Sequence, residues 1–414
     1  MKNNNKRAQV FDIIFAGAGL AGLSMAVEML KHSFFQQKHI LLIDRDAKQR
    51  NDRTWCFWAE AGDAIPPIVY HSWERCQFLS PELELAFDLF PYRYQLVRGL
   101  DFYRWAHQEL ERWPNIQRVE ANIQSMNAKA GFVCTDVGDF SGEFILNSAF
   151  TPIPVLPENA TEEWKPPLTA QKRQQPPSFT FLLQHFKGWL VQTAQPVFNP
   201  ETMTLMDFRI KQCGQTRFIY VLPFSPCRAL IEFTVFSPQL LSPATYDEAL
   251  DQYLRQTLHS SQYQILEVEF GVIPMTDYAF PKKAQGRIIH IGTAGGFVKP
   301  SSGYAFKRTL QRARTFAAAW ATEGSPNPDL LQGSPLFGLL DHVLLRVLRN
   351  NNGMGSEIFT HLFKKVPPTT VLRFLDEGCN WRDLLRILNA PPTGPFTLAL
   401  IQTLIQKLTL KKHR

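Results

Sequence analysis

The stretch Phe11-Asp-Ile-Ile-Phe-Ala-Gly-Ala-Gly-Leu-Ala-Gly-Leu23 decides how the first part of this chain folds. It opens with an apolar run short enough for a buried parallel strand, and a helical pattern of apolar residues follows. Between the two, Gly17, Gly19 and Gly22 have the spacing Gly-x-Gly-x-x-Gly. A second apolar run ends at Asp44, 22 residues after the last of these glycines. This order of strand, glycine turn, helix, strand and acid predicts a dinucleotide-binding unit.

Each part of this unit has a physical role. Gly17 permits the tight turn, Gly19 lets the backbone approach a pyrophosphate, and Gly22 lets the helix pack closely on the strand. The N–H groups at the helix start face the phosphates, and Asp44 can accept hydrogen bonds from a ribose. The residues expected to hold the dinucleotide are Ala16, Gly17, Ala18, Gly19, Leu20, Ala21, Gly22 and Asp44. The unit alone does not choose between FAD and NAD, and an ordinary βαβ unit with a glycine-rich turn is the alternative.

Length and composition indicate a folded protein with two domains or one large elaborated domain. Of the 414 residues 45% are hydrophobic and 20% charged, which is ordinary for a soluble protein. The six cysteines include no Cys-x-x-Cys pair and no His/Cys cluster has zinc spacing, so we expect free thiols in a reducing cytosol and no metal. Asp12 and Glu28 interrupt the apolar N-terminal stretch, so we expect strand plus helix and no signal peptide. No apolar run reaches about 18 residues, so we expect no transmembrane helix.

The net charge of +7 is concentrated at the C-terminal end. Residues 336–414 hold 11 basic and 5 acidic residues, a net charge of +6. No nucleic-acid motif accompanies this charge, so a membrane surface is the expected acidic partner. The segment 396–410 has the pattern of an amphipathic helix, which can lie on a membrane or pack against the body of the protein. Its apolar face consists of Leu400, Ile401, Leu404, Ile405 and Leu408.

The middle of the chain contains a predicted loop and several predicted strands. We expect residues 51–58 to form a loop in which Arg53 can pair with a cofactor phosphate, or alternatively a surface loop anchored by its tryptophans. Residues 92–98 read as a strand and 100–113 as an amphipathic helix that ends at a proline. Residues 151–177 carry seven prolines and are expected to be a loop or crossover between domains.

From residue 179 to 236 the pattern predicts antiparallel hairpins, with a turn at residues 225–226. In the last strand Ile231, Phe233 and Val235 share one face, which is expected to pack in the core. Glu232 therefore faces either water or a cavity, and the alternation cannot decide between them.

A second glycine-rich turn follows near residue 290. An apolar strand ends at Gly292, a loop with Gly295 and Gly296 follows, and a helix is expected from about Tyr304 to Trp320. This arrangement is again one that cradles phosphates and can polarise a flavin.

With these motifs in this order, the chain resembles the flavin-dependent lycopene beta-cyclases of bacterial type, from about residue 10 to 400. Besides the first glycine turn, the motifs are NDRTWCFW at 51–58, QHFKGW at 184–189, MDFR at 206–209, FIYVLPFSPCRALIEFT at 218–234, GVIPMT at 271–276 and GTAGGFVKPSSGYAFKR at 292–308. The Leu-Ile-Glu-Phe-Thr and Gly-x-Ile-Pro-Met-Thr pieces are the specific ones. The wider flavin-hydroxylase superfamily carries Gly-Asp where this chain has Gly292-Thr293, which counts against a hydroxylase.

The resemblance implies an α/β fold with three parts. These are a Rossmann-type, glutathione-reductase-like FAD-binding domain of residues 1–150 and 284–335, an inserted antiparallel β-sheet substrate domain of residues 151–283, and a basic helical C-terminal region of residues 336–414. It implies that Arg53, Gly292, Gly295 and Gly296 join the first glycine turn in binding reduced FAD, with NAD(P)H as the outside reductant.

The resemblance also implies the reaction. Enzymes of this family convert the linear ends of lycopene to beta-rings, giving gamma-carotene and then beta-carotene without net oxidation. Glu232 matches the position of the catalytic acid, and burial beside a polyene would raise its pKa. The implied partners are lycopene and related acyclic carotenoids, other carotenoid enzymes, and the inner face of the cytoplasmic membrane, with no nucleic acid. Two alternatives stay open: a flavin monooxygenase or desaturase acting on an apolar polyene, and a non-catalytic carotenoid-binding flavoprotein.

Overall fold

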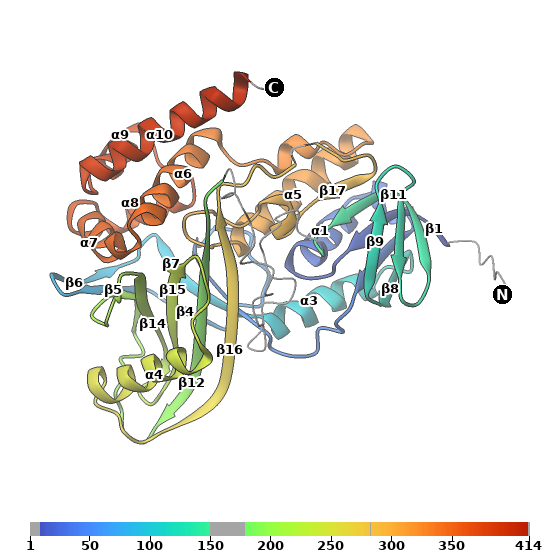
Figure 1. Cartoon of the computed structure of the whole chain (residues 1–414). Coiled ribbons are helices and arrows are strands. Elements are labelled where there is room, and N and C mark those ends of the chain that lie inside the picture. Colours follow the sequence, from blue (N-terminus) through green and yellow to red (C-terminus); the bar gives the residue numbers. More distant parts are fainter. Residues whose placement is uncertain (1–8, 150–178, 282, 413–414) are drawn as a thin grey trace.

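The computed structural model describes residues 9–149, 179–281 and 283–412, with side chains described as far as residue 406. Two large sheets form the two halves of the molecule, and helices of the C-terminal region lie above the second one (Figure 1). The predicted proline-rich loop of residues 151–177 lies outside the described residues. A small third sheet consists of β3 (Thr54–Glu60), β7 (Tyr92–Arg98) and β4 (His71–Trp73).

The first sheet has the parallel core that the opening stretch predicts. Its strand order is β8-β2-β1-β11-β10-β9, and β17 pairs with β11. The parallel strands are β1 (Gln9–Ala16), β2 (Ile40–Asp44), β8 (Ile116–Glu120), β11 (Asp139–Asn147) and β17 (Ile288–His290). The antiparallel strands β9 (Ile123–Asn127) and β10 (Phe132–Thr135) extend one edge.

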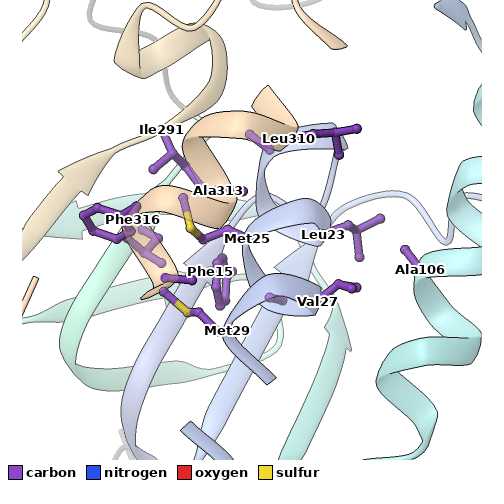
Figure 2. Packing of buried hydrophobic residues seen from close by; sticks show 14 of the residues in the cluster. Phe15, Leu23, Met25, Val27, Met29, Ala106, Ile291, Leu310, Ala313 and Phe316 are labelled. Atoms are coloured by element: carbon purple, nitrogen blue, oxygen red, sulfur yellow. The ribbon is translucent and has the colours of Figure 1, made fainter. Parts of the chain in front are cut away.

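Three helices cover one face of this sheet, because each has an apolar side to bury. They are α1 (Leu20–Leu30), α3 (Gly99–Glu111) and α5 (Phe306–Glu323); the short α2 (Ser33–Gln36) follows α1. In Figure 2, Phe15 of β1 and Met25 of α1 lie in one cluster with Leu310, Ala313 and Phe316 of α5. The predicted helices near residues 100–113 and 304–320 are therefore confirmed to within a few residues.

The segment 51–58 is a correction to the sequence analysis. We expected a loop, but Thr54–Glu60 is strand β3, which pairs antiparallel with β7 so that Trp55 lies opposite Val97. The strand forms because β7, which is distant in the sequence, satisfies its backbone hydrogen bonds. No pattern within residues 51–58 predicts that pairing.

The second sheet has the order β16-β12-β15-β14-β13-β5-β6. Its strands are β12 (Phe181–Thr193), β13 (Thr202–Asp207), β14 (Thr216–Ser225), β15 (Arg228–Ser237), β16 (Tyr263–Thr276), β5 (Arg75–Ser80) and β6 (Leu83–Asp88). The predicted hairpin of β14 and β15 is confirmed, since Val221 pairs antiparallel with Ile231. Residues 75–88 lie within the predicted FAD-binding segment 1–150, yet they pair with β13 and extend the second sheet.

Both faces of the second sheet are covered. Ile231, Phe233 and Val235 are buried in a cluster with helix α4 (Pro243–Gln252), as the alternation of β15 predicts. Leu230 and Phe236, on the opposite face, pack in the cluster that includes the C-terminal helices. Glu232 lies on the same face as Leu230 and Phe236, so its surroundings depend on the residues that cover that face.

The C-terminal helices are α6 (Pro335–Asn350), α7 (Gly355–Lys365), α8 (Pro368–Leu375), α9 (Trp381–Leu388) and α10 (Thr393–Lys412). They gather at the end of the molecule above the second sheet, with α10 running beside α6 at the outer edge (Figure 1). In the part of the chain that the structure describes, no helix combines the length and apolar character needed to cross a membrane.

Candidate active site

A cavity of about 870 Å³ joins the two halves of the molecule. One end is lined by Gly17 and Gly19 after β1 and by Gly292 after β17, and the other by Glu232 of β15 and Glu269 of β16. The two glycine-rich turns and the predicted acid, which are far apart in the sequence, therefore border one space.

The first glycine turn is shaped so that its outer side stays open. Gly17 has φ +104°, and its N–H donates to the carbonyl oxygen of Ile43 at 2.8 Å. A Cβ at Gly22 would lie 2.2 Å from the carbonyl oxygen of Gly17, so only glycine lets α1 start this close to the strand. A Cβ at Gly19 would meet no heavy atom within 4 Å, and the residue borders the cavity at the N-terminus of α1. This end of the cavity has room for a phosphate group beside unpaired N–H groups.

Asp44 is held beside the turn by several contacts. One carboxylate oxygen accepts from the N–H of Ala18 at 2.7 Å, and the other accepts from the N–H of Asp46 at 3.0 Å and lies 3.3 Å from Lys48 Nζ. Arg53 also lines the cavity and pairs with Asp52 at 2.7 Å. The carboxylate and the guanidinium thus border the space at the end where a ribose and a phosphate would lie.

The second glycine turn packs directly on the first. Gly292 has φ +60°, and a Cβ there would lie 2.8 Å from Cβ of Ala21. Gly295 and Gly296 do not line the cavity; side chains there would meet His290 and Phe280. Ala16, Ala18 and Gly22 likewise shape the turn behind the lining residues, whereas Leu20 and Ala21 line it. An open glycine turn, a fixed acid and a cavity continuing to the second sheet fit a flavin dinucleotide.

Glu232 is half-buried on the cavity wall. Its Oε1 accepts a hydrogen bond from Thr234 Oγ1 at 2.8 Å. Burial raises the pKa of Glu232 well above its usual range, and the negative charge of Glu269 raises it further, while the hydrogen bond from Thr234 opposes the shift. The cavity therefore favours the protonated form of this carboxyl group.

Glu269 was not singled out from the sequence. Its Oε2 accepts from Thr54 Oγ1 at 2.6 Å, and burial raises the pKa of this carboxyl as well. In β16 it belongs to the same alternating face as Glu267, which is exposed, so the pattern could mark both as outward but could not tell water from a cavity.

Three tyrosines stand on the cavity wall near the carboxyl groups: Tyr94, Tyr220 and Tyr304. The hydroxyls of Tyr94 and Tyr304 lie 3.3 Å apart, and burial raises the pKa of each tyrosine. Trp58 packs edge-on against Tyr304 with ring centroids 4.7 Å apart. Such rings present negative faces that can stabilise a nearby positive charge.

Asp207, the carboxyl group of the MDFR motif, lies outside the lining of this cavity. It is fully buried, pairs with Arg209 at 2.8 Å and accepts from the hydroxyl of Tyr253 at 2.8 Å. The MDFR motif at 206–209 thus contains an ion pair whose carboxylate is buried and whose guanidinium is partly exposed. Asp207 is absent from the cavity lining among the described residues.

Solved structures with the same fold define the class. A geranylgeranyl bacteriochlorophyll reductase-like protein from Thermoplasma acidophilum aligns with a TM-score of 0.56 at 10% identity, covering 94% of this chain and 98% of that one. A flavin-dependent brominase aligns with a TM-score of 0.55 at 12% identity, covering 97% and 100%. The fold is therefore the Rossmann-type fold of FAD-dependent flavoenzymes.

The family follows from sequence. The model of the lycopene cyclase protein family matches residues 12–401, and the chain belongs to that family. A lycopene beta-cyclase from Pseudescherichia vulneris is 24% identical over 409 residues, covering 93% of this chain and 95% of the relative. A lycopene beta-cyclase from Paracoccus is 30% identical over 250 residues, covering 56% of this chain and 61% of that relative.

Proposed function

We propose that the chain is a lycopene beta-cyclase, an isomerase that converts the linear ends of lycopene to beta-rings in carotenoid biosynthesis. The observation that carries the proposal is the position of Glu232, whose carboxyl borders the same cavity as the glycine turn after β1. The raised pKa favours the protonated form of that carboxyl, which is the state an acid catalyst needs.

In this proposal Glu232 starts the reaction. Its O–H bond breaks as a C–H bond forms at the terminal carbon–carbon double bond, leaving a carbocation on the neighbouring carbon. A second double bond of the polyene attacks this carbon and closes the ring. A base then removes a ring proton, so one proton enters and one leaves. The rings of Tyr94, Tyr220 and Tyr304 stabilise the cation through their faces.

The cofactor in this proposal is reduced FAD, with NAD(P)H as the reductant. Gly17, Gly19 and Leu20 would hold its pyrophosphate, Asp44 its ribose, and Gly292 of the second glycine turn would border the cofactor. When bound, the reduced flavin would supply negative charge that stabilises the carbocation. It would transfer no electrons to the product.

Coexpression with lycopene-forming enzymes, followed by carotenoid analysis, tests the function. The expected products are gamma-carotene and beta-carotene. In Glu232→Gln cyclisation should fall by about 10²–10⁴-fold, because general acid catalysis contributes that much, while FAD occupancy stays unchanged. Oxygen consumption in step with product would favour a monooxygenase, and unchanged output from the variant would favour a binding protein or another acid.

We also propose that the C-terminal helices contact the inner face of the membrane, where an acyclic carotenoid dissolves. α10 packs inward through Ala399 and Thr403 and turns its apolar face outward. The outward residues of that face are Leu400, Ile401, Leu404 and Ile405. In α9, Trp381 is 66% exposed and Leu385 50%, and residues 336–414 carry +6 of the chain's net charge of +7. Exposed apolar side chains beside basic ones fit an anionic lipid surface.

A further inference from the structure

We propose that Glu269 is a positioning residue for Glu232, and that the two carboxyl groups form a pair that shares one proton across Gly188. The inference rests on the proposed cyclase function for its chemical purpose. The pairing of the two side chains does not depend on the cyclase function and can be tested without it.

The pairing of three strands places the two carboxyl groups on one face. Gly188 of β12 lies directly opposite Glu232 of β15 on one side and Glu269 of β16 on the other. Side chains at directly opposed positions point to the same face of a sheet, and two strand spacings separate the glutamate backbones by about 10 Å. Two glutamate side chains can meet over that span if nothing stands between them.

Gly188 is the residue that leaves the space free. A Cβ at this position would lie 2.9 Å from Cγ of Glu269 and 3.2 Å from Cδ1 of Leu230. Its backbone φ lies outside the left-handed region, so the conformation of the chain does not require glycine there. Glycine at this position therefore makes room for the side chain of Glu269 and is not required by the backbone conformation.

Hydrogen bonds fix one oxygen of each carboxyl and leave another without a partner. Thr234 donates to Oε1 of Glu232, and Thr54 donates to Oε2 of Glu269. Oε1 of Glu269 is buried and accepts no hydrogen bond from any described residue. A buried acceptor without a donor is destabilising, and a protonated Glu232 is a donor of the right kind on the same face.

The surroundings favour one proton on the pair. Cys56 of β3 and Tyr220 of β14 are half-buried groups beside the pair; burial raises the pKa of both, and the pair's negative charge raises it further. Burial raises the pKa of Glu269, and the hydrogen bond from Thr54 and one that a protonated Glu232 would donate lower it. The smaller effects of Glu267 and Arg53 oppose each other. Two half-buried carboxyl groups that interact this closely do not both ionise readily, because their charges repel in a low dielectric.

The shared proton gives the pair a role throughout the cycle. Transfer of the proton from Glu232 to the double bond leaves the Glu232 carboxylate beside the carbocation, and the negative charge of Glu269 favours return of a proton to Glu232. Return of the ring proton to the pair restores the starting state. Atoms and charge balance, and no oxidant or reductant is consumed.

The test compares Glu269→Gln with the wild-type protein loaded with reduced FAD, measuring cyclisation as a function of pH. Loss of the Glu269 charge lowers the pKa of Glu232, so the pH above which activity falls should move down by about one unit or more. Glu269→Asp should restore part of the shift. Glu267→Gln, a matched change on the same strand, should move the profile far less. If the pH dependence of cyclisation in Glu269→Gln matched that of the wild-type protein, the proposal would be overturned, whether activity fell equally at every pH or did not fall.

Infrared spectroscopy of the purified protein provides a readout that needs no turnover. We expect one protonated carboxyl that persists at pH 8, disappears in Glu232→Gln, and titrates at lower pH in Glu269→Gln and in Gly188→Ala. Unchanged titration of that carboxyl in both of these variants would also overturn the proposal. A wild-type protein that shows the carboxyl but forms no cyclic product would instead reject the proposed function. Thermal unfolding and FAD content establish that each variant is folded.

Discussion

Gly19 and Gly22 lie three residues apart in the same turn, but a side chain would meet different surroundings at each. A Cβ at Gly22 would lie 2.2 Å from a backbone oxygen, which cannot move aside as a flexible side chain can. A Cβ at Gly19 would enter open space on the cavity wall. A side chain at Gly22 would therefore disturb folding, whereas a side chain at Gly19 would disturb ligand binding.

Substitution at the two positions should separate these effects. We expect Gly19→Val to fold normally and to lose FAD, because the side chain occupies the space of the pyrophosphate. Gly22→Ala should lower the melting temperature whether or not flavin is present, because α1 must shift away from β1. Flavin absorbance and thermal unfolding measure the two outcomes. Full flavin occupancy in Gly19→Val would contradict the assignment of the turn.

At the scale of elements, His185 joins strand β12 to helix α4 and to the end of β15. The hydroxyl of Ser237 donates to the carbonyl oxygen of Gln239, so it accepts from Nε2 of His185 at 2.8 Å. The hydroxyl of Tyr246, which accepts from the N–H of Leu241, donates to Nδ1 at 2.7 Å. The neutral ring is thus satisfied on both nitrogens, and a second ring proton would have no acceptor in this arrangement.

This arrangement predicts a loss of stability in acid. Burial lowers the pKa of His185 from 6.5 to about 4, and the charge of Arg217 adds to the effect. Between these values the unfolded chain binds the proton and the folded one does not. Stability should therefore fall as the pH drops from 6.5 to about 4, by about 3 kcal/mol in total. Denaturant unfolding across this range measures it, and His185→Gln should flatten the dependence. If the free energy of unfolding depended on pH equally in both proteins, the pKa of His185 would not differ between the folded and the unfolded chain.

The loop after β17 is joined to the C-terminal helices by buried ions. Lys299 is fully buried and lies 3.1 Å from Asp341 of α6 and 3.4 Å from Glu377, which follows α8. Arg308 of α5 also pairs with Glu377, and Lys307 pairs with Asp376 at 2.9 Å. The basic residues of the motif at 292–308 therefore hold the C-terminal region against the predicted flavin-binding half.

Removing the buried cation should be costly. We expect Lys299→Met to lower the free energy of unfolding by about 3–5 kcal/mol, because Asp341 is left as an uncompensated buried charge. Arg75→Met is the matched control: its ion pair with Asp88 is exposed on both sides and should contribute at most about 1 kcal/mol. Urea unfolding of both variants measures the difference. Similar losses in the two would mean that the burial of Lys299 adds no penalty.

At the scale of the whole molecule, charge and exposed apolar residues coincide. The net charge of residues 336–414 is +6 of a total of +7, and the same region holds the outward faces of α9 and α10. Figure 1 shows these helices at one end of the molecule, away from the first sheet. A membrane could meet this end without covering the first sheet.

This distribution predicts salt-dependent binding to lipid. The protein should sediment with anionic liposomes at low salt and be partly released at high salt, since screening weakens the attraction. Trp381→Ser combined with Leu385→Ser should reduce binding at every salt concentration. Val137→Ser, which removes an exposed apolar residue from the turn between β10 and β11, should leave binding unchanged. Equal binding to neutral vesicles at all salt concentrations would argue against the electrostatic contribution.

The sequence by itself determined the parts of this protein that depend on neighbours along the chain. The order of strand, glycine turn, helix and acid from Phe11 to Asp44 is local, because turn geometry and helix packing act within a few residues. The alternation in β15 likewise identified Ile231, Phe233 and Val235 as core, since the period of a strand is a local property. Glu232 could be singled out through a specific motif.

Only the tertiary structure decided what depends on pairing between distant strands. The register of β12 with β15 and β16 brings Glu232 and Glu269 to either side of Gly188, and no local pattern encodes a register set by two other strands. For the same reason β3 was mistaken for a loop, and residues 75–88 could not be placed in the second sheet. A cavity wall is made where such elements meet, so the surroundings of a half-buried carboxyl follow from packing and not from its neighbours in the chain.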